Sequence, residues 1–270
     1  MSLKNLFESP DFVKSTEAKD IASGVKLLTF RDGFQCYTHT SILETELIYN
    51  EVFVKKEYFS HSPPLQGMHT VVDVGANIGM FTLLSKRENP NLTVYSFEPI
   101  QETYEVLLRN IGLHGLKKVI TQNVAIGSSD GIERTFTYYP NMAGNSTANP
   151  AYKEYEKKVM NEAIGKERTE RAFISETRRA KVKTLSAIIR EYQISSIDFL
   201  KVDTEGDECL VLNGINDEDF TVIGHIAVEV HTDLLYKEVK SRLSQLGYTL
   251  SFDLGLSESV GVGNLYANRG

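Results

Sequence analysis

Hydrophobic and polar positions alternate along the chain in a way that predicts a sheet flanked by helices. Short apolar runs rich in β-branched residues alternate with segments whose apolar positions recur at helical spacing. The runs predict extended segments at 71–74, 92–97, 118–127, 132–138, 197–203 and 222–230, and the helical spacing predicts helices at 102–113, 183–192 and 234–246 and another beginning at 208. Residues 248–253 and 264–268 are expected to close the sheet as an antiparallel pair, joined by a hairpin loop at 255–263. The pattern indicates an α/β fold with a mostly parallel sheet and helices on both faces.

Two regions depart from this alternation and are expected to surround the sheet. Residues 1–65 are expected to form an N-terminal extension or cap, with a short strand or hairpin edge at 30–37 and apolar positions at helical spacing over 47–59. Residues 66–270 then form the main domain, which contains an insert at about 141–182. Within the insert, 151–180 is charged, helix-favouring and poor in large apolar residues, which predicts a helical lid, with a purely solvated surface helix as the alternative.

Composition excludes several classes of protein. The 270 residues carry a net charge of −7, which argues against non-specific nucleic-acid binding because that function needs a basic face. No apolar run approaches the length of a membrane span, and the first eight residues are too polar for a signal peptide. The two cysteines, Cys36 and Cys209, are far apart and are expected to be reduced thiols. We therefore expect a cytoplasmic protein with neither nucleic-acid nor membrane partners.

The richest motif is the segment Val-Val-Asp-Val-Gly-Ala-Asn-Ile-Gly at 71–79, a buried strand that enters a glycine turn and a helix. A dinucleotide-binding turn requires Gly-x-Gly-x-x-Gly, whereas this turn lacks the middle glycine and carries Asp73 at the strand end. A carboxylate there would repel a pyrophosphate but suits the ammonium and sulfonium of S-adenosylmethionine. Glu98 ends the next strand, where an acid accepts hydrogen bonds from ribose hydroxyls. The alternatives are a nicotinamide oxidoreductase, which the missing glycine disfavours, and a turn without a ligand.

Five separated segments together point to one family. They are Val-Asp-Val-Gly-Ala-Asn-Ile-Gly (72–79), Ser-Phe-Glu-Pro (96–99), Asn-Val-Ala-Ile-Gly (123–127), Leu-Lys-Val-Asp-Thr-Glu-Gly (200–206) and Val-Glu-Val-His (228–231). In this series the chain resembles the FkbM-type class I methyltransferases over about residues 45–255. The resemblance implies a Rossmann-like fold with a seven-stranded sheet and an antiparallel last strand. It also implies S-adenosylmethionine as methyl donor, S-adenosylhomocysteine as product, and O-methylation in polyketide or nonribosomal peptide biosynthesis.

The resemblance also assigns site residues. The turn residues would hold the methionine end of the cofactor, Glu98 would take the ribose, and the residues after the third strand would lie beside the adenine. Asp203 would lie at the tip of the fourth strand, next to the sulfonium. The residues carried over are Asp73, Gly75, Asn77, Gly79, Glu98, Asn123, Val124 and Asp203. Thr204 departs from the aliphatic residue that many members have before Glu-Gly, and 151–180 matches the family poorly.

Candidate catalytic residues lie at the carboxyl ends of adjacent central strands. A hydroxyl is a poor nucleophile, so its methylation needs a base or a metal ion. Glu229 and His231 are two positions apart and therefore share a face of the fifth strand, while Asp203 ends the fourth. We predict that His231 is the general base and that Glu229 orients it or contacts substrate. Lys201 is expected to pair with Asp203.

Several alternatives stay open at this point. A divalent metal is not expected, but Asp203, Glu229 and His231 could supply three ligands to Mg²⁺. The acceptor atom could be a nitrogen or a carboxylate, and the fold could be an inactive cofactor-binding scaffold. The sequence predicts a small-molecule acceptor, either free or tethered to a carrier protein, and does not name it.

Overall fold

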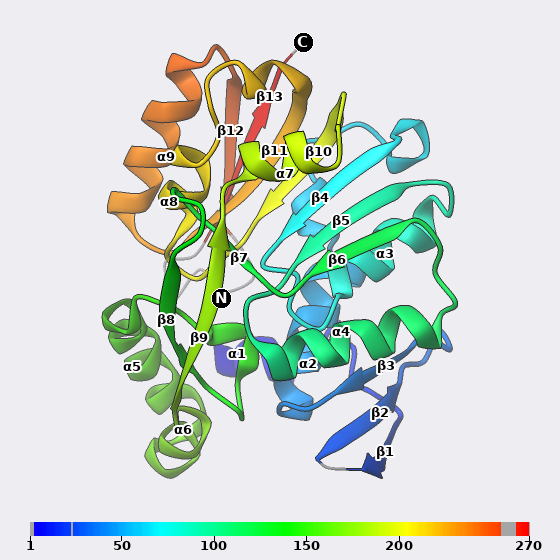
Figure 1. Cartoon of the computed structure of the whole chain (residues 1–270). Helices are drawn as coiled ribbons and strands as arrows, with labels where there is room; N and C mark the ends of the chain where they lie inside the picture. Colours follow the sequence, from blue (N-terminus) through cyan, green and yellow to red (C-terminus); the bar gives the residue numbers. More distant parts are fainter. Residues whose placement is uncertain (1–2, 23, 255–262, 270) are drawn as a thin grey trace.

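A seven-stranded sheet forms the centre of the molecule. The computed structural model describes residues 3–22, 24–254 and 263–269 (Figure 1). The strand order is β12-β13-β11-β10-β4-β5-β6, and β13 runs antiparallel to both of its neighbours while the other pairs are parallel. The strands are β4 (Thr70–Val74), β5 (Thr93–Phe97), β6 (Val119–Gln122), β10 (Ile197–Val202), β11 (Ile223–Val230), β12 (Thr249–Leu254) and β13 (Gly263–Asn268). The Rossmann-like sheet with its antiparallel strand is therefore confirmed. The hairpin loop predicted between β12 and β13 lies outside the described residues.

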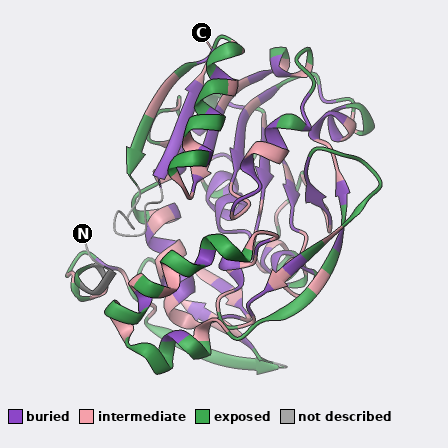
Figure 2. Ribbon diagram, turned by 90° about the vertical axis from the view of Figure 1, so that its left-hand side faces the viewer, coloured by how far each residue is buried: buried purple, intermediate pink, exposed green. Residues whose placement is uncertain are grey.

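Helices cover both faces of this sheet because its strands are apolar on both sides. In β4, Val71 packs into one hydrophobic cluster while Val72 and Val74 pack into the cluster on the other face. One cluster receives α7 (Leu185–Glu191), α8 (Glu208–Asn213) and α9 (Asp233–Gln245), and the other receives α3 (Met80–Glu88) and α4 (Gln101–Leu113). Figure 2 shows the result, with buried strands inside and exposed outer faces on the helices. Within the described residues, no helix combines the length and apolar character needed to cross a membrane.

The N-terminal region packs against the α3 side of the sheet. It contains α1 (Leu3–Glu8), β1 (Glu17–Ala22), β2 (Val25–Thr29), β3 (Gln35–Thr38) and α2 (Ile42–Tyr49), followed by a π-helical segment at Asn50–Val54 and 3₁₀ turns at Glu57–Phe59 and Leu65–Gly67. Phe30 stacks on Tyr49 with ring centroids 3.8 Å apart, and both belong to the cluster that contains Val71. The cap and the sheet therefore share one core.

The structure changes the bounds of two elements predicted in this region. The helix predicted at 47–59 begins earlier, at Ile42, and α-helical geometry ends at Tyr49, because the backbone widens into the π-helical segment and Lys56 adopts a positive φ of 52°. The hairpin edge predicted at 30–37 is present: residues 30–34 connect β2 to β3, and the two strands pair antiparallel. The sequence analysis missed β1, because all six of its residues are exposed and no apolar alternation marks it.

The insert contains both helices and strands. After β7 (Ala125–Ile126) and β8 (Glu133–Tyr138) come 3₁₀ turns at Ala143–Asn145 and Pro150–Tyr152, then α5 (Lys153–Ile164) and α6 (Lys166–Ala172). The helical prediction fails from residue 176 onward, where β9 (Glu176–Lys183) pairs antiparallel with β8 in a second sheet. Most of β9 is exposed and charged, so its sequence resembles a solvated helix, and only Ala180 and Val182 enter a core. Lys183, predicted to begin a helix, ends this strand.

Candidate active site

A cavity of about 460 Å³ lies at the carboxyl ends of β4, β5, β10 and β11, between the cap and the insert. The strand ends contribute the turn after β4, the end of β5, and acids and cations from β10 and β11. The cap contributes one face of α2 and the π-helical segment, and the insert contributes α5, α6 and residues 141–146. This is the crevice in which open α/β sheets bind ligands.

The turn after β4 fits its place only because it contains glycine. Gly75 has a φ of +76°, and a Cβ at this position would lie 1.7 Å from the backbone oxygen of Asp203. The Gly75 and Ala76 amides donate to the carbonyl of Phe97 at 3.0 and 2.9 Å, and Lys201 donates to the Gly75 carbonyl at 2.6 Å. The β4 turn, the end of β5 and β10 are therefore fixed together at the cavity floor. Gly75 and Asn77 line the cavity, as a cofactor turn should.

Three of the predicted cofactor residues lie behind the cavity wall. Asp73 is fully buried, accepts a hydrogen bond from Thr82 at 2.7 Å and lies 3.4 Å from the Lys201 ammonium. Asp73 is not among the residues that line the cavity. Its carboxylate faces Lys201 instead of the space where the methionine group of the cofactor would lie. Gly79 lies at the start of α3, where a Cβ would meet Leu107 at 2.5 Å, and Asn123 donates to the Glu98 and Pro99 carbonyls at 2.9 and 3.1 Å.

Glu98 is held in the cavity wall by backbone amides. One carboxylate oxygen accepts from the Asn77 amide and the other from the Ile100 amide, each at 2.9 Å. Burial raises the pKa of Glu98 to about 7 against the lowering effect of these two bonds. Each oxygen keeps a further lone pair, so an ionised Glu98 can accept from two neighbouring hydroxyls. Val124 also lines the cavity.

Asp203 and Glu229 share one hydroxyl donor on the cap side. The Tyr58 hydroxyl lies 3.0 Å from Asp203 and 3.3 Å from Glu229, and it carries a single proton. Lys201 pairs with Asp203 at 3.2 Å, which agrees with the predicted pairing. Burial and the charge of Asp203 raise the pKa of Glu229 well above its ordinary value. The raised pKa favours the protonated form of Glu229, and Asp203 is the carboxylate that pairs with Lys201.

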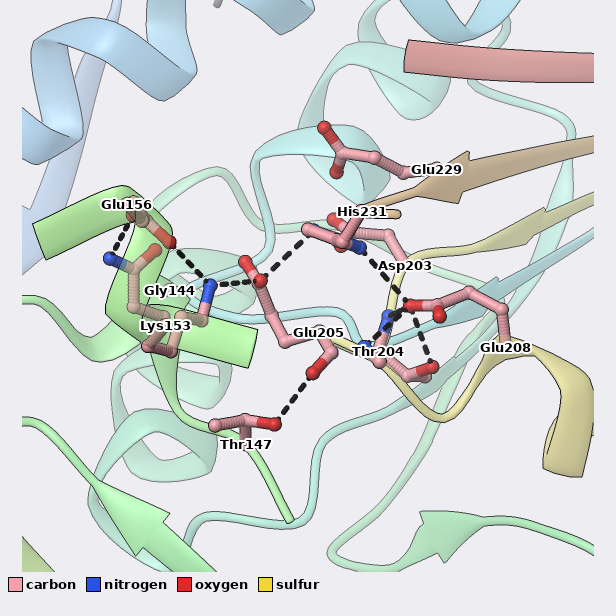
Figure 3. A network of polar contacts seen from close by, with 12 residues as sticks. Gly144, Thr147, Lys153, Glu156, Asp203, Thr204, Glu205, Glu208, Glu229 and His231 are labelled. Atoms are coloured by element: carbon pink, nitrogen blue, oxygen red, sulfur yellow. Dashed lines mark hydrogen bonds and ion pairs between the residues drawn. The ribbon is translucent and has the colours of Figure 1, made fainter. Parts of the chain in front are cut away.

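His231 lies between two carboxylates that follow β10. Its Nε2 is 2.9 Å from Glu205, and its Nδ1 is at ion-pair distance, 3.5 Å, from Glu208 (Figure 3). Burial lowers the pKa of His231, but the two carboxylates outweigh burial and hold it well above its ordinary value. The sequence analysis expected Glu229 either to orient His231 or to contact substrate. In the structure Glu205 is the carboxylate beside the His231 Nε2, and Glu229 contacts Tyr58.

Comparison with known proteins identifies the family. Residues 73–250 match the model of the "Methyltransferase FkbM domain" family. The chain belongs to this family. "Methyltransferase 1" of Beauveria bassiana is 34% identical over 212 residues, which cover 76% of this chain and 82% of the relative. "31-O-demethyl-FK506 methyltransferase FkbM" of Streptomyces tacrolimicus is 32% identical over 222 residues, covering 78% of this chain and 85% of the relative.

Two further comparisons differ in coverage and in kind. "AMB antimetabolite synthetase AmbE" of Pseudomonas aeruginosa is 31% identical over 205 residues, which are 70% of this chain and 10% of that protein. The solved structure of a "Methyltransferase FkbM" from Methylobacillus flagellatus aligns at a TM-score of 0.47 and 14% identity, covering 84% of this chain and 54% of the other.

The donor set considered for a metal differs from the one the sequence suggested. In this FkbM-family chain, Asp203, Glu205 and His231 place one donor atom each within 4.8 Å of one another, so Glu205 replaces Glu229. Both carboxylates already contact an ammonium group: Asp203 that of Lys201, and Glu205 that of Lys153. The cluster therefore carries its own counter-cations, and we assign no metal to it.

Sequence analysis missed the residues that the cap and insert bring to the site. The cap supplies Glu44, Glu51 and Tyr58, and the insert supplies Lys153. Glu44 accepts from the Gly144 amide at 2.8 Å, and burial raises its pKa to about 7. Glu51 lies in the π-helical segment, and such segments often occur at functional sites. Local sequence gave no indication of these residues, because each reaches the cavity only through tertiary packing.

Proposed function

We propose that this FkbM-family chain is an S-adenosylmethionine-dependent O-methyltransferase that acts on a hydroxyl of a specialised metabolite or biosynthetic intermediate. The observation that carries the proposal is Glu98, buried in the wall of the strand-end cavity and fixed by two backbone amides beside the glycine turn. A carboxylate held in this way suits a ribose diol.

The cavity fits the rest of the cofactor by shape and charge. The cradle at Gly75 admits no Cβ, so backbone itself forms the wall there. Acidic side chains outnumber basic ones around the cavity, which favours a ligand with an ammonium and a sulfonium group. We assign Gly75, Asn77, Glu98, Val124 and Asp203 to direct contact. Asp73, Gly79 and Asn123 would support that wall from behind.

When bound, S-adenosylmethionine supplies an electrophilic methyl group, and the protein has to align the acceptor oxygen with it and take up the hydroxyl proton. We assign the proton to His231, which lines the cavity. The carboxylates beside His231 hold its pKa high, so only the deprotonated fraction can act as a base. Methyl transfer should therefore become faster as pH rises above neutral. Glu229 and Asp203 would contact the acceptor and the sulfonium side, respectively.

The acceptor is expected to have a substantial apolar part. The cap and the insert contribute several apolar side chains to the cavity lining, among them Leu43, Leu47 and Ile48 from α2 and Met142 and Met160 from the insert. The relative from Streptomyces is named for a demethylated FK506, and another relative is an antimetabolite synthetase. These names support a natural-product acceptor, either free or presented by a carrier protein.

The first test separates cofactor use from an inactive scaffold. Calorimetric titration with S-adenosylhomocysteine should show one site per chain, unaffected by Mg²⁺, while NAD should not bind. Absence of binding by S-adenosylhomocysteine would refute the proposed cofactor.

The second test concerns the acceptor atom. Transfer of a labelled methyl group to a panel of hydroxylated acceptors should fall at least about 100-fold in His231→Asn, the usual effect of losing a general base. S-adenosylhomocysteine affinity should stay within about threefold. His61→Asn is the matched control, because His61 is exposed and paired with Asp253 outside the cavity. Unchanged transfer in His231→Asn would indicate an acceptor that needs no base, such as a neutral amine or a carboxylate.

A further inference from the structure

Lys153, at the first turn of α5, is an unusual lysine. Its side chain is 3% exposed, and its ammonium contacts two carboxylates, Glu205 and, at 2.9 Å, Glu156. A buried ammonium depends on such partners, because an uncompensated charge in this environment is strongly destabilising. Lys153 is therefore built into the site, in contrast to Lys157 one turn later, which pairs with Glu154 at the surface.

One carboxylate oxygen connects Lys153 to His231. The Oε2 atom of Glu205 contacts the Lys153 ammonium, and the same atom lies 2.9 Å from the Nε2 of His231 (Figure 3). The insert thus reaches His231 through a single shared atom. Other charges also face the pair: Glu208 and Glu229 act on His231, and Glu44 and Glu51 act on Glu205.

The insert also contacts the backbone around Glu205 through hydrogen bonds and packing. Glu205 has a positive φ of 58°, an unfavourable conformation for a residue with a side chain. Thr147 donates to the Glu205 carbonyl at 2.6 Å, and Asn149 donates to the Gly206 carbonyl at 3.2 Å. A Cβ at Gly206 would lie 2.7 Å from the ring of Tyr152, so this loop packs directly on the insert.

We propose that Lys153 is a positioning residue of the methyl-transfer site. When the insert is seated, its ammonium binds the same Glu205 oxygen that contacts His231, which fixes this carboxylate and weakens its attraction for the His231 proton. This inference rests on the proposed role of His231. Its consequence is that the segment forming the acceptor wall also completes the catalytic centre. An acceptor that displaced α5 would leave Glu205 without its anchor, so productive binding requires the insert to pack as it does here.

The test uses the full chain bound to S-adenosylhomocysteine, with NMR of ring-labelled histidine and His231→Asn to assign the His231 signal. Lys153→Met removes a cation that competes with the imidazole for Glu205 Oε2, so the pKa of His231 should rise. We expect a rise of about one pH unit, the smallest shift that a neighbouring charge within about 4–6 Å usually causes. Lys153→Arg should restore the wild-type value to within about 0.3 pH unit, since it retains the charge. Lys157→Met, the matched control on the same helix, should leave the His231 titration unchanged.

Two outcomes would overturn the proposal: an unchanged His231 titration in Lys153→Met, or a change of equal size in Lys157→Met. If Lys153→Met does not fold, Glu156→Gln replaces it. That variant leaves the Lys153 ammonium to Glu205 alone and should lower the pKa of His231, and an unchanged value would equally refute the idea. If S-adenosylhomocysteine does not bind the wild type, the proposed function fails, while the same titrations on the free protein still test the link between Lys153 and His231.

Discussion

Glu98 offers the sharpest quantitative prediction, because its pKa of about 7 lies within the range where binding can be measured. The two backbone amides and the expected ribose hydroxyls are all donors, so they bind the ionised carboxylate better than the protonated acid. Cofactor affinity should therefore be lost as pH falls through 7. The ionised fraction is about 0.9 at pH 8 and about 0.09 at pH 6, which makes S-adenosylhomocysteine bind about tenfold more weakly at pH 6, or about 1.4 kcal/mol.

Calorimetry at pH 6, 7 and 8 on the wild type and Glu98→Gln measures this effect. A glutamine has one oxygen for the two amides at 2.9 Å, so at pH 8 the variant should bind at least about tenfold more weakly, as expected for a lost charge-assisted hydrogen bond. Its affinity should also change less with pH than that of the wild type. Titration of the ligand itself is common to both proteins, so the difference in slope belongs to Glu98.

Glu44→Gln serves as the comparison variant, because Glu44 also lines the cavity and has a pKa of about 7. This variant should keep the wild-type pH dependence. The reasoning would be refuted by a wild-type affinity that varies less than twofold between pH 6 and pH 8, or by a Glu98→Gln slope equal to that of the wild type.

Two further changes test the backbone and the cap. Gly75→Ala should abolish S-adenosylhomocysteine binding and lower the unfolding temperature, because its Cβ would lie 1.7 Å from the Asp203 backbone oxygen. Gly115→Ala is the control: Gly115 has a φ of +58° and nothing within 4 Å of a Cβ, so the substitution should lower the free energy of unfolding in urea by only about 1–2 kcal/mol. Equal effects of the two substitutions would contradict the steric argument. Asn110→Ala should lower the free energy of unfolding by about 2–4 kcal/mol, because the buried Asn110 side chain forms hydrogen bonds with the amide and carbonyl of Tyr37 and with the Ile78 carbonyl. Asn161→Ala, at an exposed position, is the control. A loss below about 0.5 kcal/mol in Asn110→Ala would refute this role of Asn110.

Local sequence was sufficient wherever a strand is apolar on both faces. The strands β4, β5, β10 and β11 were predicted to within a few residues, because continuous apolar runs bounded by turns have few other structural solutions. The positions of the glycine turn and Glu98 were predicted in the same way. Each directly follows a predicted strand, so the end of that strand places it at the carboxyl edge of the sheet. The exposed strands β1 and β9 were missed because most of their positions are polar and give no apolar run. These strands are held in place by hydrogen bonds to a neighbouring strand.

What the sequence determined by itself is thus the sheet, the family and the carboxylate expected to hold the ribose. Only the tertiary structure decided which charges meet at His231. Tyr58 reaches Asp203 from 145 positions earlier in the chain, and Lys153 reaches Glu205 across 52 positions. Such pairs leave no periodic pattern, because they arise where the cap and the insert close over the strand ends. The fold of the catalytic domain is encoded in local apolar runs, whereas the electrostatics of its site depend on segments that meet only after folding.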